Sequence, residues 1–159
     1  MRLAIYAGTF DPLTLGHVDL IERSAELFEK LILAVACESK KNVLFSVEER
    51  VAMAREVVGI HSNVEVDSFE GLLINYARSK GARVLIRGLR AYSDFEYEFQ
   101  MALTNRKLAP EIETLFMMPK ETHSYVSAST VKEVASLGGN IGDFVPKVVE
   151  RMVRTKFNG

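Results

Sequence analysis

Short apolar runs recur along the chain and alternate with segments in which apolar residues return at helical spacing. This alternation is typical of a parallel sheet whose two faces are covered by helices. It predicts an α/β fold, a Rossmann-like doubly wound domain with a five-stranded parallel sheet and helices on both faces. The strands are expected at residues 2–7, 31–36, 63–67, 83–87 and 112–117.

Local signals predict where the helices lie. The first helix is expected to begin near Gly16 and to turn a stripe of Val18, Ile21, Ala25 and Phe28 toward the sheet. Ser46-Val47-Glu48-Glu49 has the spacing of a capping box and predicts the start of the second helix. The helices after the first are expected at 46–58, 70–80 and 94–108, from about 129, and from about 146.

Composition limits the classes of protein to consider. A chain of 159 residues with 48% hydrophobic content fits one domain spanning residues 1–159. Twenty basic residues against 21 acidic residues give a formal charge of −1, so we expect no nucleic-acid partner. Cys37 is the single cysteine, which excludes an intrachain disulfide. The chain enters its first strand without a basic leader or a long apolar segment, so we expect no membrane insertion and a cytoplasmic location.

The turn after the first strand is the strongest candidate for a phosphate site. The strand ends at Gly8, and a helix opens near Gly16, where unpaired amides and the helix dipole attract anions. The two glycines let the backbone approach a ligand closely, and Thr9 adds a hydroxyl. His17 lies in the first helical turn, and we expect both of its ring nitrogens to be available to phosphate oxygens.

Other chemistry-bearing residues follow other predicted strands. In an open parallel sheet, ligands bind beyond the carboxyl ends of the strands, so we expect these residues to converge at one edge. They are Thr9 and His17 after the first strand, Lys41 after the second, Arg87 and Arg90 at the end of the fourth, and 123–129 after the fifth.

The motifs together resemble a known family. Gly8-Thr9-Phe10-Asp11-Pro12 followed by Thr14-Leu15-Gly16-His17 is similar to the signature of the nucleotidylyltransferase superfamily. Lys40-Lys41 and residues 45–50, 84–90, 94–98 and 125–134 then resemble the bacterial phosphopantetheine adenylyltransferases, in order and over essentially the whole chain. The resemblance implies an enzyme that transfers the adenylyl group of ATP to 4′-phosphopantetheine, giving dephospho-coenzyme A and pyrophosphate. It also implies a homohexamer, and we expect Mg²⁺ to arrive with ATP because no carboxylate cluster has the spacing of a metal cage.

The resemblance also implies roles for individual residues. The catalytic residues would be Thr9, His17, Lys41 and Arg90, and the residues that bind 4′-phosphopantetheine would be Thr9, Lys41, Leu73 and Arg87. Such a reaction needs charge to be positioned and neutralised rather than a covalent nucleophile. The implied ATP contacts are Thr9, Phe10, His17, Gly88, Leu89, Arg90, Glu98, His123, Ser124, Tyr125, Val126, Ser127, Ala128 and Ser129.

Several alternatives stay open at this point. Lys40 is as suitable chemically as Lys41, and Leu73 fits an ordinary core position. Ala128 stands where the family usually has the middle of three serines, so ATP affinity depends on whether that position acts through its amide or its hydroxyl. The rival functions are a nicotinamide mononucleotide adenylyltransferase or a cytidylyltransferase, which commonly have histidine where Thr14 stands, and a catalytically silent nucleotide-binding regulator.

Overall fold

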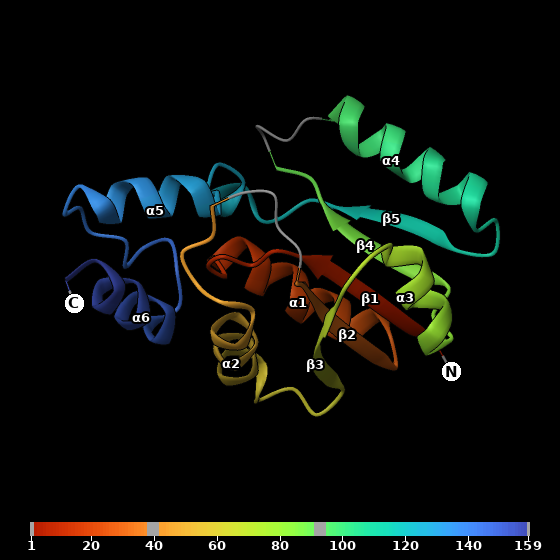
Figure 1. Cartoon of the computed structure of the whole chain (residues 1–159), viewed down its shortest axis with the longest axis horizontal. Coiled ribbons are helices and arrows are strands. Elements are labelled where there is room, and N and C mark those ends of the chain that lie inside the picture. Colours follow the sequence, from red (N-terminus) through yellow and green to blue (C-terminus); the bar gives the residue numbers. More distant parts are fainter. Residues whose placement is uncertain (1, 38–41, 91–94, 159) are drawn as a thin grey trace.

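The predicted sheet is present. The computed structural model describes residues 2–37, 42–90 and 95–158, and its five strands form one parallel sheet in the order β3-β2-β1-β4-β5 (Figure 1). Each strand lies within two residues of its predicted bounds, because apolar runs of this length are a strong local signal. The strands are β1 (Leu3–Gly8), β2 (Lys30–Ala36), β3 (Val64–Phe69), β4 (Val84–Gly88) and β5 (Glu113–Met117).

The strand order reverses at β1. After β1 the chain builds β2 and β3 on one side, then crosses back to place β4 on the other side of β1. Ala4 pairs with Leu31 of β2 and with Val84 of β4. Because the connections after β1 and β4 leave in opposite directions, a crevice opens between them at the carboxyl edge, which is where such sheets bind ligands.

Six α-helices and one 3₁₀ turn connect and cover the strands in the described residues. Ser46 begins α2 as predicted: its hydroxyl accepts from the Glu49 amide at 3.1 Å, and the Glu49 carboxylate accepts from the Ser46 amide at 3.0 Å. The helices are α1 (Leu15–Leu27), α2 (Val47–Val58), α3 (Leu73–Lys80), α4 (Phe95–Leu108), α5 (Ala128–Ser136) and α6 (Lys147–Asn158), with the 3₁₀ turn η1 (Glu121–His123).

The two faces of the sheet have separate cores. Tyr6 and Leu33 pack with α1 and α2 on one face, whereas Ile5 and Ala34 pack with α3 on the other. The side chains alternate between the faces because successive residues of a strand point to opposite sides. This confirms the prediction of helices on both faces.

The inward face of α1 differs from the prediction. Ile21 and Phe28 are buried as expected, but Leu20 and Ser24 are buried rather than Val18 and Ala25. Leu20 packs directly on β4, where a Cβ at Gly88 would meet the Leu20 Cδ1 atom at 2.6 Å. The absence of a side chain at Gly88 therefore leaves room for Leu20 of the helix that follows the turn after β1.

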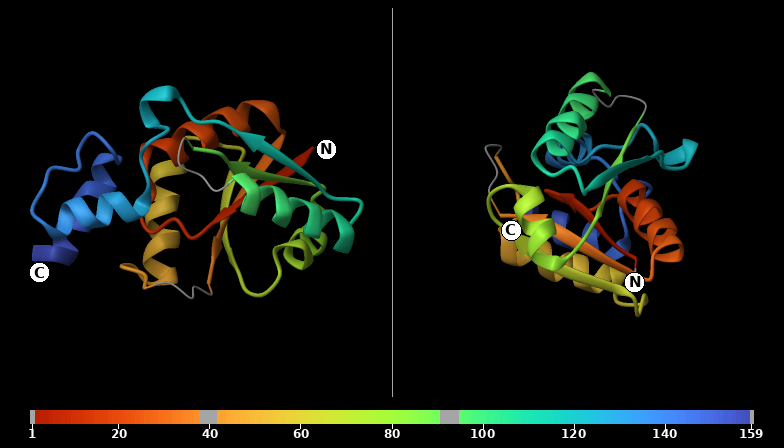
Figure 2. Two further views of the ribbon diagram at one scale, coloured as in Figure 1. Left: turned by 90° about the horizontal axis from the view of Figure 1, so that it is seen from above. Right: turned by 90° about the vertical axis from the view of Figure 1, so that its right-hand side faces the viewer.

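Two of the remaining helices, α5 and α6, add buried side chains to the core that contains Tyr6. Figure 2 shows α5 and α6 beside one end of the sheet, and α6 packs on α5 and α2. α4 has no buried residue, and Phe95, Phe99 and Leu103 on it are about half exposed, at 56%, 49% and 48%. No helix in the described part of the chain combines the length and the apolar character that crossing a bilayer requires.

Candidate functional site

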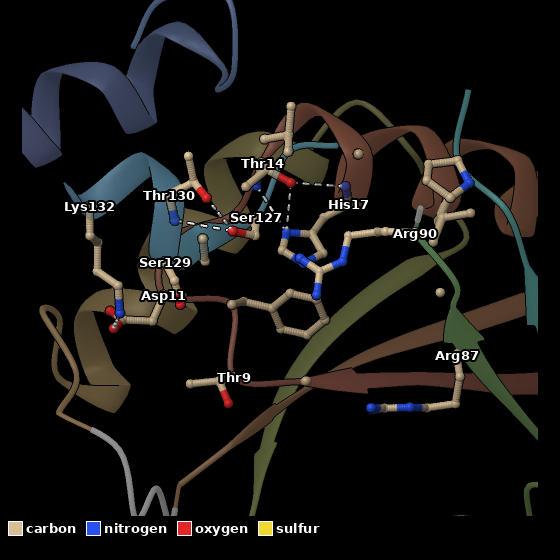
Figure 3. Close-up of a pocket in the computed structure, with 18 of the residues that line it drawn as sticks. Thr9, Asp11, Thr14, His17, Arg87, Arg90, Ser127, Ser129, Thr130 and Lys132 are labelled. Atoms are coloured by element: carbon tan, nitrogen blue, oxygen red, sulfur yellow. Dashed lines mark hydrogen bonds and ion pairs between the residues drawn. The ribbon is translucent and has the colours of Figure 1, made fainter. Parts of the chain in front are cut away.

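A cleft of about 510 Å³ opens at the carboxyl edge of β1 and β4 (Figure 3). Its walls come from the turn after β1, the end of β4, and the loop between β5 and α5, so segments far apart in the sequence meet there. The structure brings most of the predicted site residues together. Those that line the cleft are Thr9, Phe10, His17, Arg87, Gly88, Arg90, Ser124, Tyr125, Val126, Ser127, Ala128 and Ser129.

The turn after β1 is tied to α1 by a reciprocal cap. The Thr14 hydroxyl accepts from the His17 amide at 3.4 Å, and the His17 Nδ1 atom accepts from the Thr14 amide at 2.9 Å. A capping box normally uses a glutamate or glutamine for the second bond. Here an imidazole makes it, so the residue that stabilises the helix start is also the residue that faces the cleft.

The cap determines the tautomer of His17. Since Nδ1 accepts a hydrogen bond, the proton of the neutral ring lies on Nε2. Burial, with further contributions from Arg90 and Arg87, lowers the pKa of His17 to about 4, so the ring is neutral at neutral pH. The expectation that both ring nitrogens would serve phosphate was wrong: the Thr14 amide occupies one, and Nε2–H is the donor that remains.

Phe10 sits beneath this histidine in an unusual backbone conformation. Its φ is +52°, a left-handed value that costs a non-glycine residue energy. Its ring packs edge-on against His17 and Tyr6, with centroid distances of 5.1 and 5.3 Å. A Cβ at Gly8 would meet the ring at 3.1 Å, so glycine lets the aromatic ring fold back over the strand end without a shift.

Arg87 and Glu98 form an ion pair at the rim of the cleft. Arg87 Nε and Nη2 donate to the two Glu98 carboxylate oxygens at 2.9 and 3.1 Å, and Nη1 donates to the Ala7 carbonyl at 3.1 Å. Burial opposes the arginine charge, but the bonds to Glu98 outweigh it and raise the pKa of Arg87. The family resemblance assigned Arg87 to 4′-phosphopantetheine and Glu98 to ATP, whereas in the structure the two side chains form an ion pair with each other.

The loop before α5 supplies the wall opposite the turn. Ser127 caps α5: its hydroxyl accepts from the Thr130 amide at 3.1 Å. Ala128 and Ser129 occupy the first turn of that helix, where amides lack intrahelical partners and favour an anion. Asp19 of α1 holds the beginning of this loop, since its carboxylate accepts from the Lys120 amide at 2.9 Å.

Asp11 and Lys132 also line the cleft and were missed as site residues. Asp11 is 2% exposed and accepts hydrogen bonds from the amides of Leu44 and Phe45 at 2.8 and 2.9 Å. Lys132 pairs with the same carboxylate at 3.0 Å (Figure 3). Lys132 was detectable, because it follows Ser129 by three residues and therefore lies on the same face of a helix. The partners of Asp11 come from distant segments that no local pattern connects.

Four predicted residues in the described part of the chain do not line this cleft: Leu73, Leu89, Glu98 and His123. Lys41 and its alternative Lys40 fall outside the described residues. Leu73 packs partly buried against the core of the α3 face. His123 lies in η1, where its carbonyl would be 3.5 Å from a Cβ at Gly16. Leu89 borders a neighbouring, more apolar pocket with Phe95, Met118 and Pro119.

Known proteins share sequence with this chain over nearly its whole length. The cytidylyltransferase-like family model matches residues 5–134. The chain is 55% identical over 157 residues to a phosphopantetheine adenylyltransferase of Carboxydothermus hydrogenoformans, covering 99% of this chain and 97% of that one. It is 56% identical to one of Desulforudis audaxviator, covering 99% and 96%.

The fold likeness extends to remote sequences. A crystal structure from Vibrio parahaemolyticus, described as a nicotinate-nucleotide adenylyltransferase, superposes with a TM-score of 0.72 at 13% identity. The match covers 96% of this chain and 99% of that chain. At that identity, the likeness shows the shared doubly wound fold alone.

Proposed function

The chain belongs to the phosphopantetheine adenylyltransferases of the cytidylyltransferase-like family, and from that membership we propose how its cleft performs the reaction. The enzyme transfers the adenylyl group of ATP to 4′-phosphopantetheine, giving dephospho-coenzyme A and pyrophosphate. We further propose that residues 1–159 form a single nucleotidylyltransferase domain. The observation that carries the mechanism is the neutral His17, whose Nε2–H remains as a hydrogen-bond donor in the cleft. Arg87 of β4 and Arg90, which follows β4, line the same cleft.

His17, Thr9 and Arg90 are proposed to act on the reacting phosphates. The acceptor phosphate is already ionised, so the step needs no general base, and stabilising charge in the transition state is the main task. A neutral Nε2–H donates to a nonbridging oxygen of the α-phosphate without the stronger ground-state attraction that a charged imidazolium would add. Arg90 lies beside the His17 ring (Figure 3) and supplies the positive charge.

Arg87 is proposed to bind the phosphate of 4′-phosphopantetheine, with Lys41 and Thr9 on the same group. In the cleft, the Arg87 guanidinium is aligned by Glu98 and the Ala7 carbonyl. A dianionic phosphate would share it or displace Glu98, which would then be available to hydroxyl or amine groups of the nucleotide. Leu73 is proposed to border the pantetheine arm.

The nucleotide is proposed to extend from the cleft into the adjoining apolar pocket. That pocket has a volume of about 570 Å³ and is bordered by Leu89, Phe95, Met118 and Pro119. Apolar walls of this kind suit a purine base. Gly88, Phe10 and residues 123–129 would run along the ribose and triphosphate, with the first-turn amides of α5 on the outer phosphates.

Mg²⁺ is proposed as the cofactor. The described residues contain no group of three or more histidine, cysteine or carboxylate side chains arranged to hold a metal ion. Asp11, a carboxylate of the cleft wall, is engaged with Lys132 and two amides. The donor set therefore fits a magnesium ion bound chiefly by triphosphate oxygens and water, which neutralises phosphate charge when it is bound.

We also propose a cytoplasmic homohexamer, as the family resemblance implies. The exposed apolar side chains of α4 support an assembly, since a surface of this kind is typical of a subunit contact. They are Phe95, Tyr97, Phe99, Met101 and Leu103.

Pyrophosphate release tests the function directly. Purified protein with Mg²⁺ and ATP is given 4′-phosphopantetheine, nicotinamide mononucleotide or no acceptor. We expect release with 4′-phosphopantetheine alone and dephospho-coenzyme A in equal amount. Release with nicotinamide mononucleotide alone would assign the chain to the rival branch, and tight ATP binding without turnover would indicate a regulator.

A further inference from the structure

Arg50 of α2 is a buried charged residue that has no role in the function proposed above. It is 2% exposed and is among the largest fully buried side chains of the described protein. Its guanidinium donates to three carbonyls, of Phe45 at 3.1 Å, Thr9 at 2.9 Å and Ala36 at 2.8 Å. Burying a guanidinium costs free energy unless its N–H groups are hydrogen-bonded, and here the three carbonyls provide those bonds.

The three acceptors belong to different parts of the sheet edge. Thr9 follows β1, Ala36 ends β2, and Phe45 precedes α2. Asp11 also binds Phe45: its carboxylate accepts from the Phe45 amide, while Arg50 donates to the Phe45 carbonyl. The turn after β1 is thus tied to β2 and α2 by one cation and one anion.

The bond to Thr9 has a consequence for the cleft. In a planar trans peptide the C=O and the next N–H point in opposite directions. With the Thr9 carbonyl directed inward to Arg50, the Phe10 N–H is directed away from it, and both residues line the cleft. No hydrogen bond to the Phe10 amide is found among the described residues. The left-handed φ of Phe10 shows that this peptide is held in a costly orientation.

We propose that Arg50 is a positioning residue for adenylyl transfer: its guanidinium fixes the Thr9-Phe10 peptide so that the Phe10 amide and the Thr9 hydroxyl meet a phosphate. This inference rests on the proposed function. Arg50 touches no reacting atom and acts through the backbone of the turn. A lysine cannot replace it, because a single ammonium group does not reproduce a planar fork that spans three carbonyls.

The kinetic test uses Arg50→Lys, with Val58→Ala as the matched control. Val58 is 3% exposed on the same helix and packs in the core, so the control loses stability without touching the turn. We expect Arg50→Lys, assayed well below its Tm, to lose about 10- to 100-fold in kcat with less than about threefold change in the KM for ATP. Val58→Ala should keep the kcat of the unsubstituted protein. A kcat for Arg50→Lys equal to that of Val58→Ala overturns the proposal.

A spectroscopic test follows the Phe10 amide itself. The protein is labelled with ¹⁵N-phenylalanine, which marks nine residues, and the Phe10 signal is assigned with Phe10→Leu. We expect pyrophosphate to shift this signal in the unsubstituted protein and to shift it much less in Arg50→Lys. Equal shifts in both proteins would count against positioning by Arg50. Arg50→Gln replaces Arg50→Lys if the latter does not fold.

If neither variant folds, the unsubstituted protein decides: a Phe10 signal unmoved by saturating pyrophosphate refutes the proposal, and a shifted signal supports it. Failure of the proposed function is distinguishable, because the unsubstituted enzyme would then release no pyrophosphate with 4′-phosphopantetheine.

Discussion

Replacing His17 by alanine removes two interactions that the structure allows us to separate. The first is the Nε2–H donor to the α-phosphate. Removal of one preorganised donor of this kind typically costs about 10²- to 10³-fold in kcat, or about 2.7–4 kcal/mol of transition-state stabilisation. Because the bond strengthens as charge develops, we expect the Kd for ATP to change by less than about tenfold.

The second interaction is the cap at the start of α1. His17 Nδ1 accepts from the Thr14 amide at 2.9 Å, and alanine leaves that amide without this partner. Loss of a cap or of one such bond costs about 1–3 kcal/mol of the free energy of unfolding. For a domain of this size, each kcal/mol lowers the Tm by about 2–4 °C.

Thr14→Val is the matched control. It removes the hydroxyl, which accepts from the His17 amide and also lies 3.2 Å from His17 Nδ1, yet keeps the shape of the side chain and the backbone N–H that orients the imidazole. We expect it to lose stability comparable to His17→Ala while losing less than about tenfold in kcat. Thermal unfolding measures the capping cost, calorimetry gives the Kd for ATP, and pyrophosphate release gives kcat and KM.

Two results would refute this reasoning. If His17→Ala weakened ATP binding by the same factor as it lowered kcat/KM, the histidine would bind the ground state rather than the transition state. If Thr14→Val lost as much kcat as His17→Ala, the loss would come from the helix start and not from the Nε2–H donor.

Four other expectations follow from the same geometry. Between pH 6.5 and about 4, His17 is protonated in the unfolded chain but not in the folded chain. The free energy of unfolding should therefore fall as pH is lowered through that window, by at most about 1.4 kcal/mol per pH unit. Urea titrations of His17→Ala should lack this component. Glu98→Gln should lower the KM for 4′-phosphopantetheine by up to about fivefold in steady-state kinetics, because a phosphate no longer competes with a carboxylate for Arg87; a raised KM would contradict this. Ala128→Ser should leave the calorimetric Kd for ATP within about twofold if the position acts through its amide, and a tighter Kd would show that a hydroxyl is missing. Phe99→Glu on the exposed face of α4 should reduce the mass of the assembly in light scattering without unfolding the chain, and an unchanged mass would remove that face from the interface.

Local signals were enough to predict the strands, the helices and the glycine-containing turn between β1 and α1. An apolar run predicts a buried strand from its own residues alone. The Ser46-Glu49 capping box and the glycines of the turn that contains Thr9 likewise determine structure within a few residues of their own positions. The convergence of the turn, the end of β4 and the loop before α5 also followed from the pattern, because the carboxyl ends of parallel strands share one edge.

Features that depend on contacts between distant segments were not predictable in this way. Helical periodicity did not predict that Leu20 of α1 is buried. Leu20 packs against Gly88, which is 68 residues away in the sequence, and the spacing of apolar residues within one helix carries no information about such a contact. The ion pair of Arg87 with Glu98 and the three carbonyls around Arg50 likewise arise only when separate elements are brought together.

His17 shows where local and long-range information divide. Its place at the start of a helix, three residues after Thr14, is written in the chain and suffices to predict a phosphate contact. Its charge state is not, because desolvation by the surrounding fold and the approach of Arg90 and Arg87 lower its pKa to about 4. Periodicity and capping act over a few residues and can be read from the chain, whereas burial and electrostatic fields sum over everything that the fold places nearby.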